Sequence, residues 1–177
     1  MNDRKVLMRR FIAYLVDWYV GALVVSFPIG LFSQKLFGTA NNLNLLKFPE
    51  SYGVIAGILS MICGLFYFVV VPTWIWKGQT LGKHILHLKI VGNNNDDINL
   101  KTMLIREVLV IMLFEERMYN ISTILQQLFT LLTQIQVVRA VVTIFWVITI
   151  VSALLVVLSK NAQSLHDLIA HKIVVIV

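Results

Sequence analysis

The residues with the clearest potential for chemistry are Arg10 and Asp17, which lie in the first apolar stretch of the chain. Because an α-helix has 3.6 residues per turn, their spacing of seven places them on one face, about 10 Å apart along the axis. A carboxylate among apolar residues costs about 2.5–3.5 kcal/mol in a membrane, so Asp17 should face a helix bundle and have a partner such as Arg10. The pair is either a site that loads and releases a proton or cation, or a structural ion pair that fixes helix order.

Other ionisable side chains stand beside later apolar runs. Arg106 is isolated in one such run, and His166 and Asp167 open the last amphipathic stretch. Imidazole titrates near neutral pH, so His166 could relay protons, but we favour a role in which Asp167 anchors its stretch by pairing with a basic side chain. We expect one linked cytoplasmic-side cluster of Arg10, Asp17, Arg106 and Asp167. The candidate residues for binding an ion or a proton are Asp17, Arg10, Asp167, His166 and Arg106.

The loop 78–83 contains two glycines and a lysine and invites comparison with a phosphate-binding loop. A P-loop has four residues between its glycines and a serine or threonine after its lysine. Here three residues separate Gly78 from Gly82, and His84 follows Lys83, so the nucleotide-binding interpretation fails. A tight turn that holds a positive charge at lipid headgroups fits the sequence better.

Neither enzymatic nor metal-dependent chemistry is expected. Ser164, His166 and Asp167 are too close in sequence to face one another as a catalytic triad. The histidines form no H-x-x-x-H or Cys/His frame, which would be typical of a metal site. We therefore expect a protein that is not an enzyme and that needs no cofactor and no metal.

The composition predicts a membrane protein. Apolar residues make up 58% of the chain and charged residues 14%, and a soluble domain of this size could not cover so much apolar surface. The net charge of +6 comes from basic residues at the ends of apolar runs, which the positive-inside rule explains better than binding to nucleic acid. We expect a multi-pass protein of the cell membrane, embedded in the lipid bilayer, with both termini cytoplasmic.

The candidate residues must be positioned by membrane-spanning helices within one domain over 1–177. Hydropathy predicts four crossings, at about 11–37, 52–76, 118–136 and 139–159. A competing assignment makes 103–119 the third crossing and lays 118–136 on the outer surface. We favour the first assignment, because the apolar run that starts at residue 103 covers only about 18 Å of helix, whereas 118–136 is longer and carries no full charge.

The segments between these crossings are a cytoplasmic loop 77–102, a partly buried helix 103–117 and a cytoplasmic tail 160–177. In the loop, strands 85–91 and 98–100 flank a turn signal rich in asparagine and aspartate, which predicts a β-hairpin. In the tail, residues 172–177 are rich in valine and isoleucine and could pair with strand 88–91. The expected fold is an all-α membrane protein, a four-helix transmembrane bundle with a small cytoplasmic β-hairpin.

Small residues line one face of the second predicted helix. Gly53, Gly57 and Gly64 recur at helical spacing, with Ser60 between them, and would let another helix approach closely. We favour packing inside the same bundle, because small-residue spacing alone is unspecific. The alternative is a homo-oligomer or a membrane-protein partner that docks at these three glycines.

Several of these motifs occur in the order of one known family. The chain resembles the RDD family of small membrane proteins, named for one arginine and two aspartates. The matching positions are Arg10, Ala13 and Asp17, then Gly78, Thr80, Gly82 and Lys83 of a G-x-T-x-G-K loop, the strand 89–91, Leu104-Ile105-Arg106, the run 164–167 and the closing strand 172–175. The chain departs from the family in its long stretch between Arg106 and Asp167, and in the His171-Lys172 that replaces Gly-Thr.

The resemblance implies a membrane protein from a family of mostly unknown function. Transport of a ligand has been proposed for the family, some members look like cation/proton exchangers, and others look like membrane adaptors. We therefore hold two hypotheses: proton- or cation-linked transport of a small solute or ion with Asp17 as the binding acid, or a non-transporting accessory protein (an immunity, assembly or adaptor factor) that docks another membrane or secreted protein. The glycine face, the glutamines of 118–136 and the small size motivate the second.

Overall fold

The computed structural model describes residues 3–92, 100, 104, 121–135, 151, 154 and 172–176. Its longer elements are the helices α1 (Asp3–Phe37), α2 (Glu50–Leu65), η2 (Phe66–Ile75) and α5 (Ile121–Thr133). The shorter ones are η1 (Leu45–Lys47), α3 (Leu81–Ile85) and the strands β1 (Leu88–Gly92) and β2 (Lys172–Ile176). The described part of the chain is thus mostly helical, as predicted.

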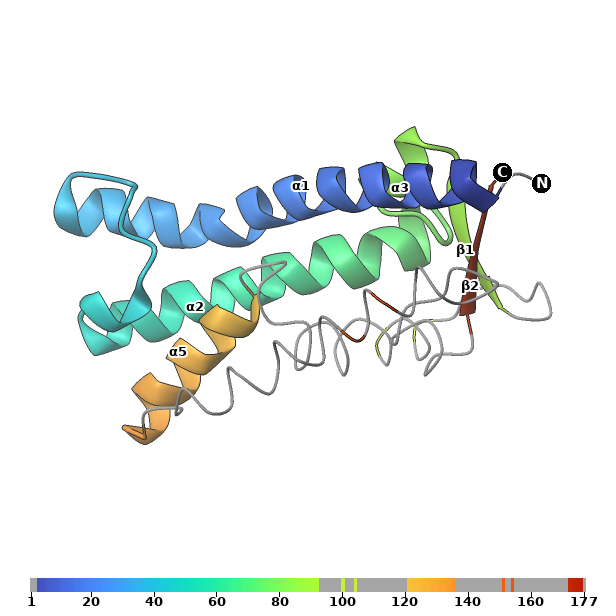
Figure 1. Ribbon diagram of the computed structural model, residues 1–177. Coiled ribbons are helices and arrows are strands. Elements are labelled where there is room, and N and C mark those ends of the chain that lie inside the picture. Colours follow the sequence, from blue (N-terminus) through green and yellow to red (C-terminus); the bar gives the residue numbers. More distant parts are fainter. Residues whose placement is uncertain are drawn as a thin grey trace.

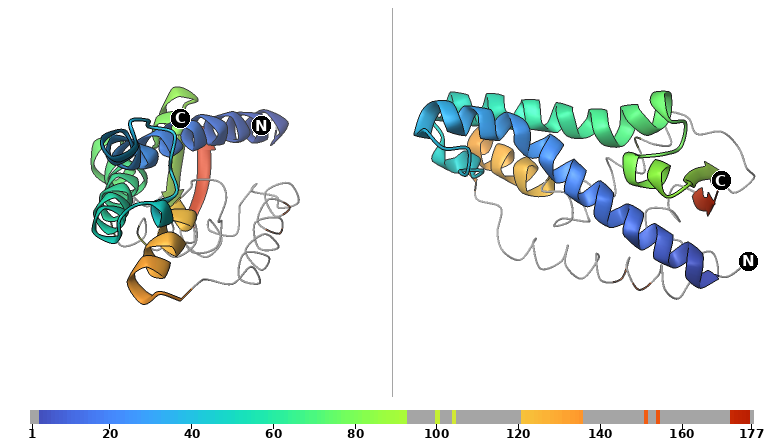
Figure 2. Two further views of the ribbon diagram at one scale, coloured as in Figure 1. Left: turned by 90° about the vertical axis from the view of Figure 1, so that its left-hand side faces the viewer. Right: turned by 90° about the horizontal axis from the view of Figure 1, so that it is seen from above.

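The two long helical segments lie side by side (Figures 1 and 2). The short helix α3 and the two strands lie at the end where α1 begins, and α5 packs along α2, toward the other end of the molecule. The stretches Leu7–Phe37 and Glu50–Ile75 are each long and apolar enough to cross a membrane. They cover the first two crossings that hydropathy predicts, except for Trp76 at the end of the second.

Helix α1 presents one buried row to the rest of the molecule. Most of the buried positions follow a spacing of four residues, namely Ala13, Asp17, Gly21, Val25, Ile29 and Ser33, and Pro28 is buried beside this row. The opposite face carries exposed large apolar side chains, among them Phe11, Leu15, Trp18, Leu23, Phe27 and Leu31. A face this apolar is stable against acyl chains and not against water, so the buried row is the side that packs on protein.

The second long segment changes its hydrogen-bonding pattern along its length. It is α-helical to Leu65 and continues as the π-helix η2, which contains Pro72. The Trp76 N–H then donates to the Val71 carbonyl at 2.9 Å, which closes the segment. Single π-turns are more usual than a run of this length, and they often occur beside functional sites.

The glycine face of α2 is covered from within the chain. A Cβ on Gly57 would lie 2.6 Å from Leu128, and one on Gly64 would lie 3.0 Å from Ile121, both on α5. A Cβ on Gly53 would likewise lie 3.0 Å from Leu131 of α5. Helix α5 of the same chain therefore packs on these glycines, as in the arrangement that we favoured, and a partner at this face would have to displace α5.

Gly57→Ala is expected to lower the free energy of unfolding by about 1–3 kcal/mol, because the added methyl group overpacks the contact with α5. Its Cβ would lie 2.6 Å from Leu128 Cδ2 and 2.9 Å from Leu45 Cδ1. Thermal unfolding of the purified protein in detergent measures the effect. The neighbouring Ile58 is exposed, so Ile58→Ala is the control that should change little. Equal melting temperatures for Gly57→Ala and wild type would contradict this packing.

Helix α5 also binds the connection between α1 and α2. The Leu45 N–H donates to Gln127 Oε1 at 2.8 Å. One of the glutamines of 118–136 therefore makes a contact within the chain and not with a partner. With 13 residues, α5 extends about 20 Å, less than the roughly 30 Å of a bilayer core. The described helix alone is therefore too short to cross. The segments 103–119 and 139–159 lie almost wholly outside the described residues, so the third and fourth crossings stay predictions.

The strand β1 pairs antiparallel with β2, from Leu88 opposite Ile176 to Gly92 opposite Lys172. The predicted pairing between the valine-rich tail and strand 88–91 is thus confirmed. The predicted β-hairpin is not: Leu100 is helical instead of extended, and residues 93–99 lie outside the described part of the chain. Leu88 and Ile90 are fully buried and pack in one apolar cluster with Ala13 and Val69, which attaches the strand to both long helices.

Candidate functional site

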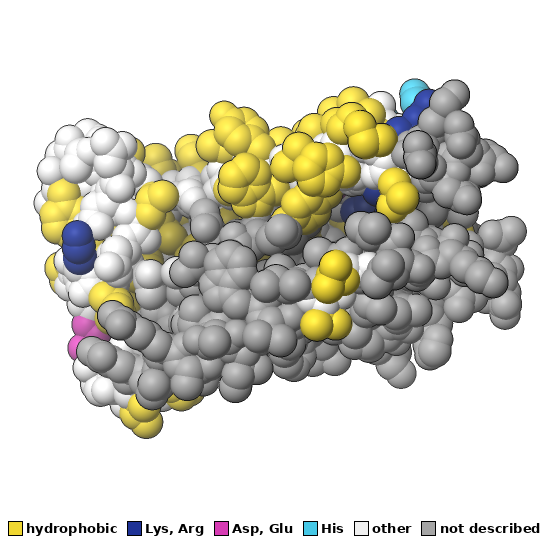
Figure 3. Space-filling view, in the orientation of Figure 1, with side chains coloured by type: hydrophobic (Ala, Val, Ile, Leu, Met, Phe, Trp, Pro, Cys, Tyr) yellow, Lys and Arg dark blue, Asp and Glu magenta, His cyan; other side chains and the backbone are white. Residues whose placement is uncertain are grey.

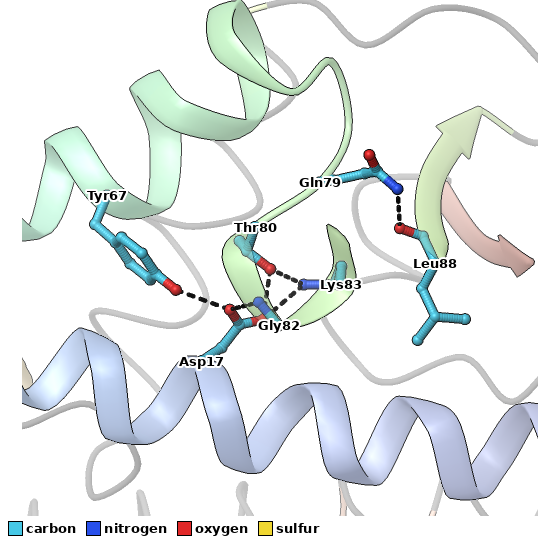
Figure 4. A network of polar contacts seen from close by, with 7 residues as sticks. All are labelled: Asp17, Tyr67, Gln79, Thr80, Gly82, Lys83 and Leu88. Atoms are coloured by element: carbon cyan, nitrogen blue, oxygen red, sulfur yellow. Dashed lines mark hydrogen bonds and ion pairs between the residues drawn. The ribbon is translucent and has the colours of Figure 1, made fainter. Parts of the chain in front are cut away.

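Asp17 lies at the centre of a closed polar network between α1, η2 and the loop before α3 (Figure 4). Its side chain is 2% exposed. The Tyr67 hydroxyl donates to Oδ1 at 2.9 Å and the Gly82 N–H donates to the same oxygen at 2.8 Å. The Thr80 hydroxyl donates to Oδ2 at 2.5 Å. Three donors from two distant segments therefore replace water around this buried carboxylate.

The charge of the carboxylate is balanced by Lys83. Its Nζ lies 3.8 Å from Asp17 Oδ2 and donates to the Thr80 hydroxyl at 3.4 Å. The lysine side chain is 17% exposed, so the ion pair reaches from the buried acid toward the surface of the molecule. An uncompensated charge at this depth would cost several kcal/mol, and the lysine and the three hydrogen bonds offset that cost.

The close approach of the loop to α1 depends on Gly82. A Cβ at this position would overlap the Ala13 carbonyl oxygen and would lie 3.0 Å from Asp17 Cγ. Ala13 is itself small and buried, one turn before Asp17 on the same face of α1. The two small residues together allow the Gly82 N–H to reach the carboxylate.

The start of the same loop is tied to the sheet. Gly78 has φ of 101°, a left-handed conformation that favours glycine, and its carbonyl accepts from the Ile90 N–H at 2.8 Å. Gln79 Nε2 donates to the Leu88 carbonyl at 2.8 Å. The edge of β1 that faces away from β2 is therefore occupied by the loop. The loop 78–83 thus connects the buried acid to the strand that pairs with β2.

An aromatic stack fixes the outer side of the loop. The rings of Trp76 and His84 lie 4.9 Å apart and nearly parallel. His84 Nδ1 is 3.0 Å from Gln79 Oε1, so the same glutamine contacts both the histidine and β1. The loop is therefore held on its inner side by Asp17 and on its outer side by the end of η2.

The cation that the structure places beside Asp17 is Lys83, which the sequence did not predict as its partner. The loop folds back over α1 and brings this lysine to the acid. A contact between Arg10 and Asp17 stays a prediction. Arg106, His166 and Asp167 lie outside the described residues, so their membership of a cluster stays a prediction.

Sequence reasoning identified the loop but missed its contact with Asp17, and it missed Tyr67 altogether. Gly78, Thr80, Gly82 and Lys83 all have a structural role at or next to the acid. The only sequence signal for Tyr67 is its hydroxyl in a mostly apolar helix, and this residue is 50 positions from Asp17. Within the described part of the chain, no three His, Cys, Asp or Glu side chains gather to hold a metal ion.

A comparison with protein families matches residues 4–171, almost the whole chain, to the RDD family. The chain belongs to the RDD family. No curated protein and no solved structure matches it. Membership of the RDD family and the two long apolar helices fit a membrane protein. In this RDD protein, the aspartate in the first helix and the G-x-T-x-G-K loop are parts of a single site, because the loop supplies three of the four groups around the carboxylate.

Proposed function

We propose that this RDD protein is a multi-pass protein of the cell membrane that couples the movement of a small ion or solute to protonation of Asp17. The supporting observation is a carboxylate that is 2% exposed, lies in a helix long enough to span a membrane, and has a lysine as its counter-ion. Ionisable groups at such positions are usually tied to ion or proton pathways.

Both termini lie on the cytoplasmic side in this proposal. Arg9 and Arg10 are at the start of α1 and Lys77 follows η2, at the same end of the helix pair. The last strand, β2, lies at this end too (Figure 1). The positive-inside rule assigns such a basic end to the cytoplasm.

A proton is the ion that this site accepts with the least rearrangement. Both carboxylate oxygens already accept hydrogen bonds from protein donors, so a metal cation would have to displace several of them. A proton that arrives from water needs only one carboxylate oxygen. The protonated acid carries no charge, so its attraction for Lys83 and its hydrogen bond from Gly82 both weaken. Uptake of a proton thereby loosens the loop 78–83 from α1, and release of the proton restores the contact.

The test is ion flux in proteoliposomes that carry a pH gradient. A series of monovalent cations is added in turn, and wild type is expected to dissipate the gradient with at least one of them. Asp17→Asn is expected to reduce this flux to that of empty vesicles. Glu50 is an exposed acid at the other end of the described fold, so Glu50→Gln is the matched control and should keep the wild-type flux. The proposal is wrong if wild type equals empty vesicles across the series of ions, or if Asp17→Asn transports as well as wild type.

The alternative proposal is a non-transporting accessory protein. Two observations that favoured it, the glycine face and the glutamines of 118–136, now support it less. Helix α5 covers the glycines of α2, and Gln127 accepts a hydrogen bond from Leu45 within the chain. A partner would therefore use another surface. Purification from native membranes separates the two proposals: a stable partner together with absence of flux supports docking, whereas a protein that transports by itself supports the proton-coupled mechanism.

A further inference from the structure

The end of the molecule that carries α3 exposes apolar side chains next to basic ones (Figure 3). Trp74 is 63% exposed at the end of η2, and Ile85 is 55% exposed at the end of α3. The neighbouring side chains of Lys77, His84 and His87 are also exposed. We call these five residues the basic rim. Tryptophan and basic residues at the end of an apolar helix are typical of the headgroup layer of a membrane.

The basic rim is held in place by the folded loop. The stack of Trp76 on His84 joins the end of η2 to α3, so residues from both elements form one surface. Lys77, which precedes the loop 78–83, and His87, which follows α3, have φ of 34° and 54°. Their left-handed backbone is uncommon for such residues and turns the chain sharply before the loop and after α3. The rim is thus a built surface and not a set of independent side chains.

We propose that the basic rim binds the phosphate of anionic phospholipid headgroups, in preference to zwitterionic ones. The rim and an anionic headgroup are complementary in charge. The exposed charged side chains described at this end are basic, as at Arg9 and Lys77, and the acid described nearby, Asp17, is buried against Lys83. At the opposite end Glu50 is exposed together with Lys35 and Lys47. The lysine supplies the charge, the histidines supply N–H donors, and Trp74 and Ile85 contact the glycerol and upper acyl region.

The experiment is a titration of the full chain in detergent with phosphatidylglycerol or phosphatidylcholine, with binding followed by tryptophan fluorescence and by thermal shift. Wild type is expected to bind phosphatidylglycerol at least about tenfold more tightly. Lys77→Gln should weaken that binding about fivefold, which corresponds to the loss of one basic group near an anionic surface. Lys35→Gln, at the opposite end, is the matched control and should retain the wild-type affinity.

The source of the phosphate is tested by competition with inorganic phosphate. We expect millimolar phosphate to compete weakly, because it cannot contact Trp74 and Ile85. Complete competition would show that free phosphate is the ligand and would overturn the proposal. Equal affinity for both lipids, or an equal loss in Lys35→Gln and Lys77→Gln, would also overturn it. The lipid titration uses neither a pH gradient nor flux, so its result does not depend on whether the protein transports.

Discussion

Asp17→Ala is expected to lower the free energy of unfolding by about 3–5 kcal/mol, the range for breaking a buried ion pair by removal of one partner. The substitution removes the carboxylate that pairs with Lys83 and leaves the buried Tyr67 hydroxyl and Gly82 N–H without their acceptor. Each buried group that loses its hydrogen bond adds to the cost. Thermal unfolding in detergent, followed by circular dichroism, measures the change.

Two further variants separate the charge from the hydrogen bonds. Asp17→Asn keeps an oxygen that can accept from Tyr67 and Gly82 but places its NH2 group beside Thr80 and Lys83. Its loss of unfolding free energy should therefore be smaller than that of Asp17→Ala. Tyr67→Phe removes one donor and should cost about 1 kcal/mol or somewhat more, because the remaining acceptor is charged. Unchanged melting temperatures for both Asp17 variants would contradict the network in Figure 4.

Gly82→Ala is expected to destabilise the protein by about 3 kcal/mol, at the upper end of the range for overpacking. The added Cβ overlaps the Ala13 carbonyl oxygen and lies 3.0 Å from both the Ala13 carbonyl carbon and Asp17 Cγ. Two of these atoms belong to the backbone of α1, which cannot move aside as the end of a flexible side chain can. The loop must therefore shift away from α1, and the hydrogen bond from the Gly82 N–H to Asp17 is lost with it.

The matched control for this substitution is Gly30→Ala, on helix α1. A Cβ on Gly30 would lie 3.8 Å from the Ala40 carbonyl oxygen, an ordinary contact. Because alanine favours a helix over glycine by about 1 kcal/mol, this variant should melt at or above the wild-type temperature. If Gly82→Ala also melts with the wild type, the loop does not approach α1 as closely as described.

Local sequence patterns were sufficient to predict the two long helices. Hydrophobic runs of sufficient length occur at Leu7–Phe37 and Glu50–Ile75, and runs of this length and composition predict helices without knowledge of any other part of the chain. The expectation that strand 88–91 pairs with the valine-rich tail was also correct, because short β-branched runs have few other ways to satisfy their backbone. The predicted hairpin was not confirmed. A turn signal after Val91 shows that the chain can reverse direction there, but it does not say which later segment pairs with strand 88–91.

The spacing of the glycines in α2 is compatible with two kinds of packing. Their spacing in α2 indicates close approach of a helix, but it does not tell whether that helix belongs to the same chain. Packing of Leu128 and Ile121 of α5 against Gly57 and Gly64 answers the question. The answer depends on contacts across more than 50 residues, and no local pattern encodes it.

The amino-acid sequence alone identified Asp17 as an acid in need of a partner, because the cost of a charge among apolar residues depends only on its immediate neighbours. It also identified the loop 78–83 as a tight, basic turn, since glycine and lysine have those properties anywhere. Which cation meets the acid was decided by the tertiary structure, where Gly82 and Ala13 let the loop fold onto α1 and bring Lys83 within 3.8 Å. Tyr67 joins the same site from a second helix. Ion pairs and hydrogen bonds act over a few ångströms, and distances that short between remote segments are set only when the helices pack.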